Sequence, residues 1–333
     1  MTGFRVESTR GGLVESVHHV SVAVTDAEGR LIASAGDPDL VTYWRSAAKP
    51  FQAIPVVADG AADAFGLDDE ELALACASHS SEPMHLEIAS RFLARIGCTE
   101  DDLACGPHTP LGHGVAERVA RNGERLTPRW SNCSGKHAGM LALAKHRGWS
   151  TGGYERAGHP VQDRLLAEVS RWAGVAASDV GLAVDGCTTV CYALPLRAMA
   201  ASYARLAQSA EPAARRVREA MQRHPRIIAG TARLCTDLGL AWPDGIIAKV
   251  GAEGVYSAAL LQSGHGIALK VGDGEMRAAQ VALLGVLRQT LAAIGGDAAP
   301  LERLAARAQP PIRNTRRERT GAVRTAGSLA FTG

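Results

Sequence analysis

Strand-like segments stand at both ends of this chain, and mostly helical segments lie between them. Residues 14–24 alternate apolar and polar side chains in their second half, and turn residues follow at 26–29. Residues 30–36 then resume an extended pattern, so the segment predicts a β-hairpin. Glycines divide residues 245–272 into three further β-like runs, and the last dozen residues also have an extended pattern.

Helical spacing occurs in the middle of the chain and again near its end. Apolar residues recur at helical intervals over residues 83–96, after a proline suited to a first turn, and over residues 276–294. We therefore predict an α+β fold in a single domain covering residues 1–333. Its antiparallel sheet is expected from about 1–45 and 245–333, with flanking helices and a mostly helical region at about 46–244.

Composition excludes several classes of protein. The chain has 333 residues and a formal net charge of +2, which argues against affinity for nucleic acid through many phosphate contacts. No apolar run approaches the roughly 18 residues of a membrane span, and the first residues do not resemble a signal peptide, so we expect a cytoplasmic protein without membrane partners. The cysteine count of 7 is odd, which favours buried, reduced thiols over a disulfide framework.

The tetrapeptide that begins at Ser46 and ends at Lys49 is the sharpest chemical feature. Residues three apart share one face of a helix, so the hydroxyl and the amine could meet. Pro50 belongs in the first turn of a helix, which places Ser46 at the helix entrance. A lysine in a dry pocket can serve as the base for a serine nucleophile. The alternative is a capping serine and a solvated lysine.

Four other motifs place polar residues before or at the start of an element. CASHSSEP (76–83) precedes the predicted helix at 83–96, and the alternative to a catalytic role there is helix capping by Ser80 or Ser81. NCSGKH (132–137) leads into an apolar helix, DGCTTVC (185–191) contains two cysteines four apart, and KVGAEG (249–254) opens a β-like run. Two Ser/Lys combinations and loop cysteines suit a serine hydrolase whose bases are lysines.

These motifs together resemble those of the L-asparaginase II family, which is related in fold to serine β-lactamases and glutaminases. The resemblance implies a fold of that type and hydrolysis of the side-chain amide of L-asparagine to L-aspartate and ammonia. It also implies a homodimer. The matching stretches span most of the chain in the family's order: RSAAKP (45–50), ALACASHSSEP (73–83), NCSGKHAGML (132–141), DGCTTVCYALPL (185–196), KVGAEGVY (249–256) and GIALKVGDG (266–274).

The resemblance also assigns roles by position. Ser46 with Lys49 and Ser78 with Lys249 correspond to two catalytic Ser–Lys pairs, and Lys270 is an alternative to Lys249. The remaining assignments form two groups. The residues that correspond to the family's zinc ligands, where zinc would support substrate binding, are Cys133, Lys136 and Cys187. The polar residues that are candidates for substrate binding or for positioning the catalytic groups are Arg45, His79, Glu82, His137 and Asp185.

Two other functions remain open at this point. One is a glutaminase or another serine amidohydrolase of the same fold. The other is a non-catalytic protein that binds an amino acid or zinc in the same pocket. Release of ammonia from asparagine distinguishes the enzyme from the binding protein.

Overall fold

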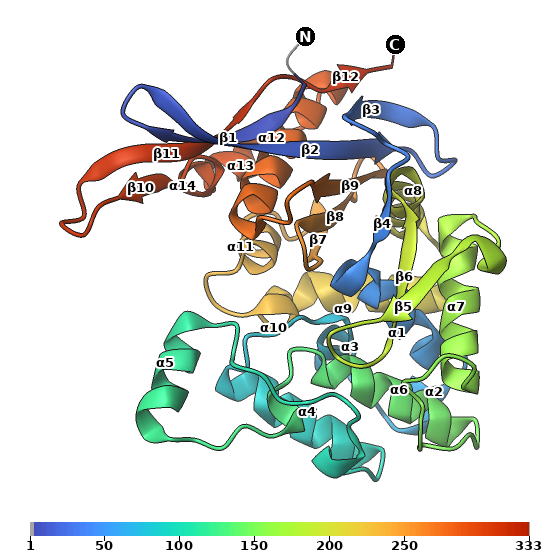
Figure 1. The fold of residues 1–333 in the computed structure, drawn as a ribbon. Helices are drawn as coiled ribbons and strands as arrows, with labels where there is room; N and C mark the ends of the chain where they lie inside the picture. The colour runs from blue at the N-terminus through green and yellow to red at the C-terminus, as the bar shows by residue number, and fades with distance from the viewer. Residues whose placement is uncertain (1–2, 333) are drawn as a thin grey trace. The chain divides into compact units, whose positions relative to one another are not determined.

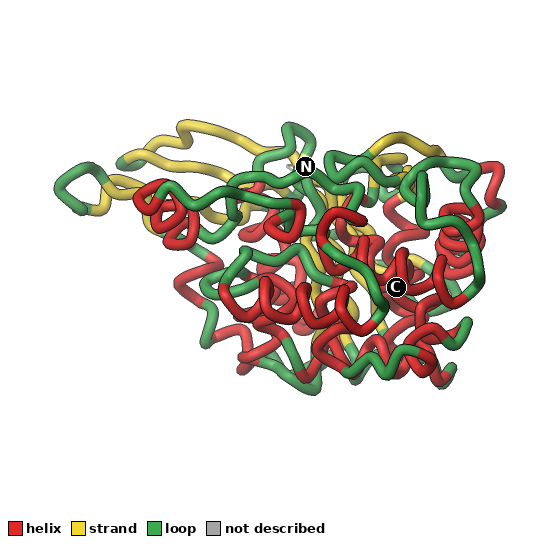
Figure 2. The backbone as a smooth tube through the Cα atoms, turned by 90° about the horizontal axis from the view of Figure 1, so that it is seen from below, coloured by secondary structure: helices red, strands yellow, loops and turns green. Residues whose placement is uncertain are grey.

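The computed structural model describes residues 3–332 and divides the chain into two compact units. Most strands belong to unit 1 and most helices to unit 2. Figure 2 colours helices red and strands yellow. Unit 1 contains Met1–Ala47, Leu194–Gln208 and Asp237–Gly333, and unit 2 contains Ala48–Ala193 and Ser209–Thr236.

Unit 1 is built on one antiparallel sheet that uses both ends of the chain. Its strands are β1 (Arg5–Arg10), β2 (Leu13–Thr25), β3 (Leu31–Ala35), β7 (Ile246–Val250), β8 (Val255–Leu260), β9 (His265–Val271), β10 (Pro311–Arg313), β11 (Arg319–Ala326) and β12 (Ala330–Phe331). They are ordered β10-β11-β1-β2-β9-β8-β7, with β3 pairing with β2 and β12. Strands from the two chain ends lie side by side, in blue and in red or brown (Figure 1), because Arg5 pairs with Ala326 and Val20 with Val271.

Helices pack against this sheet and complete the core of unit 1. The helices that contact it most are α8 (Leu196–Gln208) and α12 (Met276–Ile294), and the chain also forms α11 (Leu234–Ala241), α13 (Ala299–Glu302) and α14 (Ala305–Ala308). Val22, Leu269 and Leu287 are completely buried. Burial of side chains from both chain ends and from α12 makes the association of the two ends favourable.

Unit 2 is mostly helical. Its helices are α1 (Lys49–Ala58), α2 (Ala61–Ala64), α3 (Asp69–Cys76), α4 (Pro83–Arg95), α5 (His113–Asn122), α6 (Ser134–His146), α7 (Pro160–Ala173), α9 (Pro212–Arg223) and α10 (Pro225–Ala229). A capping box begins α3, where the Asp68 side chain accepts from Glu71 N–H and the Glu71 side chain accepts from Asp68 N–H. Helices α1, α6 and α9 all pack against α3, so α3 lies at the centre of the unit.

The structure confirms the predicted α+β fold with an antiparallel sheet built from both chain ends. The predicted hairpin is β2–β3, and the three β-like runs at 245–272 are β7, β8 and β9. The helix predicted at 276–294 has the same bounds as α12. The middle region also contains an antiparallel strand pair, β5 (Gly181–Val184) and β6 (Val190–Pro195), where the pattern had indicated only a short strand or loop.

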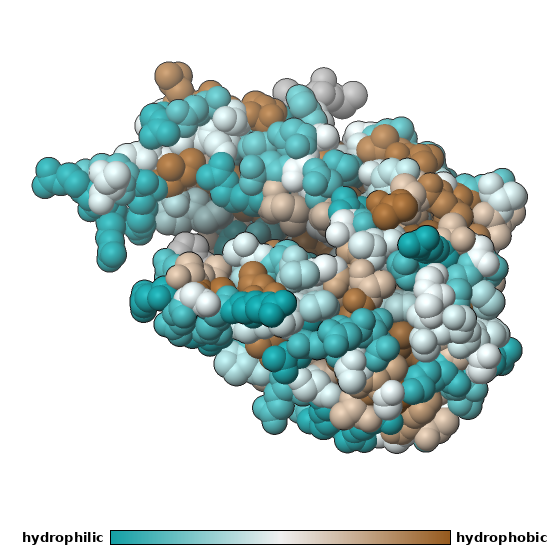
Figure 3. All heavy atoms as spheres, turned by 60° about the horizontal axis from the view of Figure 1, so that its bottom comes forward, coloured by the Kyte–Doolittle hydropathy of each residue, from teal (hydrophilic) through white to brown (hydrophobic). Residues whose placement is uncertain are grey.

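Among residues 3–332, no helix combines the length and the apolar character that a membrane-spanning segment needs. Over much of the face that Figure 3 shows, hydrophobic residues are interspersed among hydrophilic ones.

Candidate active site

Lys49 and Ser78 form a buried Ser–Lys pair in unit 2. Lys49 is the first residue of α1 and is 0% exposed, and Ser78 follows the end of α3. The Lys49 Nζ atom lies 3.1 Å from Ser78 Oγ, 2.5 Å from the Ala77 carbonyl oxygen and 3.5 Å from the Asn132 carbonyl oxygen. The spacing argument had assigned Lys49 to Ser46, and the structure gives Lys49 a different serine as a hydrogen-bond partner.

Backbone hydrogen bonds hold the segment that carries Ser78. The N–H of Ser78 donates to the Ile228 carbonyl at 2.9 Å, and the N–H of His79 donates to the Asn132 carbonyl at 3.3 Å. The Ser78 N–H is therefore already bonded within the protein, and the hydroxyl is held in place beside Lys49.

The next serines do not cap α4, so the capping hypothesis is wrong for both. The Ser80 hydroxyl donates to the Ala229 carbonyl at 2.7 Å, and the Ser81 hydroxyl donates to the Trp130 carbonyl at 2.8 Å. The N-cap residue is Glu82, whose N–H donates to His85 Nδ1 at 3.0 Å. Both serines instead attach the Ser78 segment to neighbouring parts of unit 2.

His79 is a neutral positioning residue in this segment. Its Nδ1 accepts the Ser81 N–H at 3.2 Å, so the ring proton is on Nε2, which donates to Ser134 Oγ at 2.9 Å. Burial, together with neighbouring basic groups, holds the pKa of His79 well below its usual range. A fully buried, neutral imidazole links the segment after Ser78 to the start of α6.

Gly135 sets how closely α6 approaches α3. A Cβ atom at this position would lie 2.3 Å from the Leu74 carbonyl oxygen, closer than real contacts allow. Only glycine therefore fits, and the close contact brings the first turn of α6, with Cys133 and Lys136, against the helix that precedes Ser78.

Cys133, Lys136 and Cys187 converge, as their proposed role as a ligand trio requires. Lys136 Nζ donates to Cys187 Sγ at 2.9 Å, and the Cys133 thiol forms a hydrogen bond with Cys187. That bond, with the Lys136 charge, lowers the pKa of Cys187 to about 5, and the same bond and burial raise the pKa of Cys133 to about 12. Burial would lower the pKa of Lys136, but the two sulfur atoms raise it above its usual range. The site favours a thiolate beside an ammonium group.

This donor set suits zinc. Thiolates are strong zinc ligands, and a deprotonated lysine amine is a nitrogen donor. Asp185 Oδ2 lies 3.9 Å from Cys187 Sγ, and Asp185 also accepts the Gly186 N–H. Within residues 3–332, His, Cys, Asp and Glu alone form no cluster of three that could hold a metal, so a zinc site here depends on the lysine as third ligand.

His137 lies next to the trio and is oriented by Tyr154, a residue that the sequence motifs did not indicate. The Tyr154 hydroxyl accepts the Ala104 N–H at 2.9 Å and donates to His137 Nδ1 at 2.7 Å. Burial, with the nearby Lys136 charge, lowers the pKa of His137 to about 3, so the ring is neutral.

The other two proposed catalytic residues, Ser46 and Lys249, belong to unit 1. Ser46 lies in the 3₁₀ turn Arg45–Ala48, which begins with a left-handed residue at Arg45 (φ 54°). Trp44 Nε1 donates to Ser257 Oγ at 3.1 Å, and Ser257 pairs with Lys249 across β7 and β8. The segment just before Ser46 therefore packs on the sheet face that carries the fully buried Lys249.

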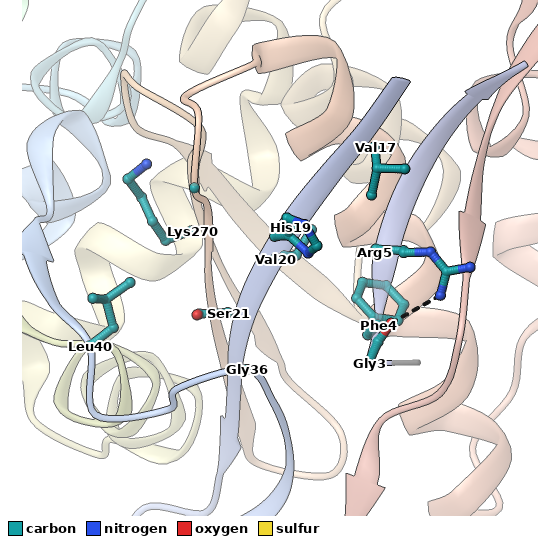
Figure 4. Close-up of a pocket in the computed structure, with 11 residues that line it drawn as sticks. Gly3, Phe4, Arg5, Val17, His19, Val20, Ser21, Gly36, Leu40 and Lys270 are labelled. Atoms are coloured by element: carbon teal, nitrogen blue, oxygen red, sulfur yellow. Dashed lines mark hydrogen bonds between the residues drawn. The ribbon is translucent and has the colours of Figure 1, made fainter. Parts of the chain in front are cut away.

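Lys270, the alternative to Lys249, lines a pocket on the sheet of unit 1 (Figure 4). It pairs with Ser21 across β2 and β9, and burial lowers its pKa. The ammonium group of Lys270 and the guanidinium of Arg5 point to different sides of this pocket (Figure 4), and Arg5 forms an ion pair with Glu7 at 2.6 Å. The pocket does not gather its basic groups around one point.

The model of the L-asparaginase II family matches residues 6–325. The chain belongs to the L-asparaginase II family. This membership confirms the resemblance drawn from the motifs and supports a hydrolase with asparaginase-type function. No curated protein sequence matches the chain.

Solved structures include distant matches. A β-lactamase from Mycobacterium bovis is 12% identical, with a TM-score of 0.43 over 82% of this chain and 94% of that one. An octameric penicillin-binding protein homologue from Pyrococcus abyssi is 11% identical, with a TM-score of 0.43 over 85% of this chain and 74% of that one.

Proposed function

We propose that this protein hydrolyses the side-chain amide of L-asparagine, with Ser78 as nucleophile and Lys49 as its general base. The observation that supports this most is the buried contact between Lys49 Nζ and Ser78 Oγ at 3.1 Å. A serine hydroxyl is a weak nucleophile unless an adjacent base accepts its proton. Family membership supports an amide substrate of the asparagine type.

The hydrogen bonds of Lys49 direct the lone pair of its neutral amine at the Ser78 hydroxyl. A neutral amine has two N–H donors and one lone pair. The Ala77 and Asn132 carbonyls accept the two N–H groups, which leaves the lone pair for the Ser78 hydroxyl. After proton transfer, all three N–H groups of the ammonium have acceptors.

The reaction then proceeds by acyl transfer. Ser78 Oγ bonds to the amide carbon as its proton passes to Lys49, and the carbonyl electron pair moves to oxygen. When the C–N bond breaks, Lys49 returns the proton to the leaving nitrogen, which departs as ammonia and leaves an aspartyl ester on Ser78. Water, deprotonated by Lys49, attacks this ester, and the Ser78 oxygen leaves with the proton to release aspartate.

Ser46 and Lys249 are proposed as a second Ser–Lys pair. Both lie in unit 1, and the contact between Trp44 and Ser257 brings the segment before Ser46 to the strands that carry Lys249. The pairing of Ser78 with Lys249, assigned by motif position, stays an alternative.

Zinc is proposed as a bound cofactor held by Cys133, Lys136 and Cys187. When bound, zinc would act as a Lewis acid toward polar groups of the substrate. The chain's own contribution there is the donor set and its orientation by His137 and Asp185. The homodimer and the cytoplasmic location stay predictions from the sequence.

The proposal is tested by a coupled ammonia assay with L-asparagine, L-glutamine and a β-lactam as separate substrates. We expect turnover of asparagine that is abolished in Ser78→Ala. Faster turnover of glutamine would instead identify a glutaminase, and binding of asparagine without ammonia release would identify a binding protein.

A further inference from the structure

Arg233 lies in unit 2 beside the segment that carries Ser78. It is half-buried, it precedes α11, and its Nη1 donates to Ser80 Oγ at 3.2 Å. Ser80 is 0% exposed and stands two residues after Ser78. Among the residues that the structure describes, no carboxylate lies within ion-pair distance of Arg233. Its positive charge is therefore not neutralised within the described protein.

Gly230 allows the loop before Arg233 to pass this close to Ser80. Its φ of 106° is a conformation that L-residues rarely adopt, and a Cβ there would lie 2.8 Å from Ser80 Cβ. Glu82, an acid beside Gly230, already accepts the Thr231 N–H at 2.6 Å and the Thr231 hydroxyl at 3.2 Å. Glu82 therefore holds the loop and does not pair with Arg233.

Basic groups surround this part of the site. Besides burial, the groups that lower the pKa of His79 are all bases: His85, Lys49, His108 and Arg233. The histidines His79 and His85 have lowered pKa values, because both rings are buried, and are neutral. The guanidinium of Arg233 is a fixed positive charge near these rings. A half-buried guanidinium without a carboxylate partner is a favourable place for an anionic group of a ligand, because desolvated charges are stabilised only when paired.

We infer that Arg233 binds the α-carboxylate of the amino-acid substrate, an inference that rests on the proposed function. When the amide carbon of asparagine is at Ser78 Oγ, a short carbon chain separates it from the α-carboxylate. Ser80 stands two residues after Ser78, and Arg233 donates to the Ser80 hydroxyl. The planar guanidinium can donate two parallel N–H bonds to a carboxylate while it also contacts Ser80. Arg233 thereby selects free amino acids over amides that lack this carboxylate.

The test combines removal of the guanidinium with removal of the carboxylate. The substrates are L-asparagine and β-alaninamide, which is asparagine without its α-carboxylate. We expect Arg233→Met to lower kcat/KM for asparagine about 30-fold, mostly through KM, since a hydrogen bond to a charged group is lost. Turnover of β-alaninamide should be unchanged by Arg233→Met, and Arg233→Lys should recover part of the loss with asparagine.

Arg129→Met is the matched control. Arg129 is also a half-buried arginine of unit 2 that donates to a serine, Ser90, at 2.7 Å, but it lies outside the proposed site. Arg129→Met should leave kcat/KM unchanged for both substrates. An equal loss on both substrates in Arg233→Met would show a structural role and overturn the inference, and so would an unchanged KM for asparagine.

Binding of L-aspartate by calorimetry separates this inference from the proposed function. If the wild type releases no ammonia from asparagine, the proposed function fails, and the Kd for aspartate then tests Arg233 alone. We expect Arg233→Met to weaken aspartate binding about 30-fold, to the level of β-alanine, which lacks the α-carboxylate. An unchanged Kd, or no binding of aspartate to the wild type, would overturn the inference.

Discussion

Replacement of Lys49 by methionine tests the central feature of the proposed mechanism. Methionine keeps most of the length and the apolar stem of lysine but removes the amine that contacts Ser78 Oγ at 3.1 Å. Loss of a general base lowers rates by about 10² to 10⁴, so we expect kcat to fall about 10³-fold. KM should change much less, because the lost interaction acts on the nucleophile.

The effect on stability should be modest. The substitution removes the Lys49 donor of the Ala77 carbonyl at 2.5 Å, and an unsatisfied buried acceptor costs about 1–3 kcal/mol. The Asn132 carbonyl keeps its hydrogen bond from the His79 N–H. Loss of a fully buried amine offsets part of this cost. A chain of this size loses roughly 2–4 °C in Tm per kcal/mol, so Tm should fall by only a few degrees.

Three variants complete the experiment, each assayed by ammonia release and by thermal melting. Ser78→Ala should match Lys49→Met in kcat, and the double variant should be no slower than either, because residues that act as a unit are not additive. Lys145→Met is the control, since Lys145 is an exposed lysine of unit 2 that donates to the Gly97 carbonyl at 2.9 Å. If Lys49→Met kept more than about a tenth of wild-type kcat, or if the two losses multiplied, the base would have to be another group.

Three further predictions concern the second lysine, the metal and an ion-pair network. Lys249→Met should lower kcat at least about 10²-fold, whereas Lys270→Met should lower kcat only slightly. The opposite result would identify Lys270, on β9, as the second base. Chelation with EDTA should raise KM several-fold with little change in Tm, and the double variant Cys133→Ser/Cys187→Ser should show the same KM and Tm as the chelated protein. Absence of zinc by elemental analysis, together with unchanged kinetics of the double variant, would refute this prediction. Glu168 is buried, which raises its pKa, but Arg and Trp donors at 2.5–2.8 Å lower it overall. Because the folded pKa is below the unfolded value, its stabilisation is full above the ordinary value of 4.5 and is lost as pH falls through the folded pKa. Glu168→Gln should therefore lower the free energy of unfolding by about 2 kcal/mol at pH 7, and melts showing a constant difference down to pH 3 would contradict the reasoning.

Local patterns were sufficient to predict most of the elements. The bounds of α12 follow from apolar residues at helical spacing, and β7, β8 and β9 follow from runs of apolar residues between glycines. Pro50 indicated a helix start near this position, and α1 begins at Lys49, whereas Ser46, the predicted helix entrance, lies in the preceding 3₁₀ turn. These signals depend on neighbours a few residues away, which the sequence shows directly.

Partners in the site depended on long-range contacts. The three-residue spacing suggested Ser46 for Lys49, but Lys49 begins α1 within unit 2 and its amine reaches Ser78, 29 residues later. The family resemblance, and not spacing along the chain, had grouped Cys187 with Cys133 and Lys136, and the structure brings these three side chains together.

Arg233 stands in no motif, and only the return of the chain at Gly230 brings it to Ser80. The sequence alone therefore determined the residue types, the elements and the family. The tertiary structure decided which donor meets which acceptor. A contact between distant residues depends on how whole helices and loops pack, and spacing along the chain does not predict it.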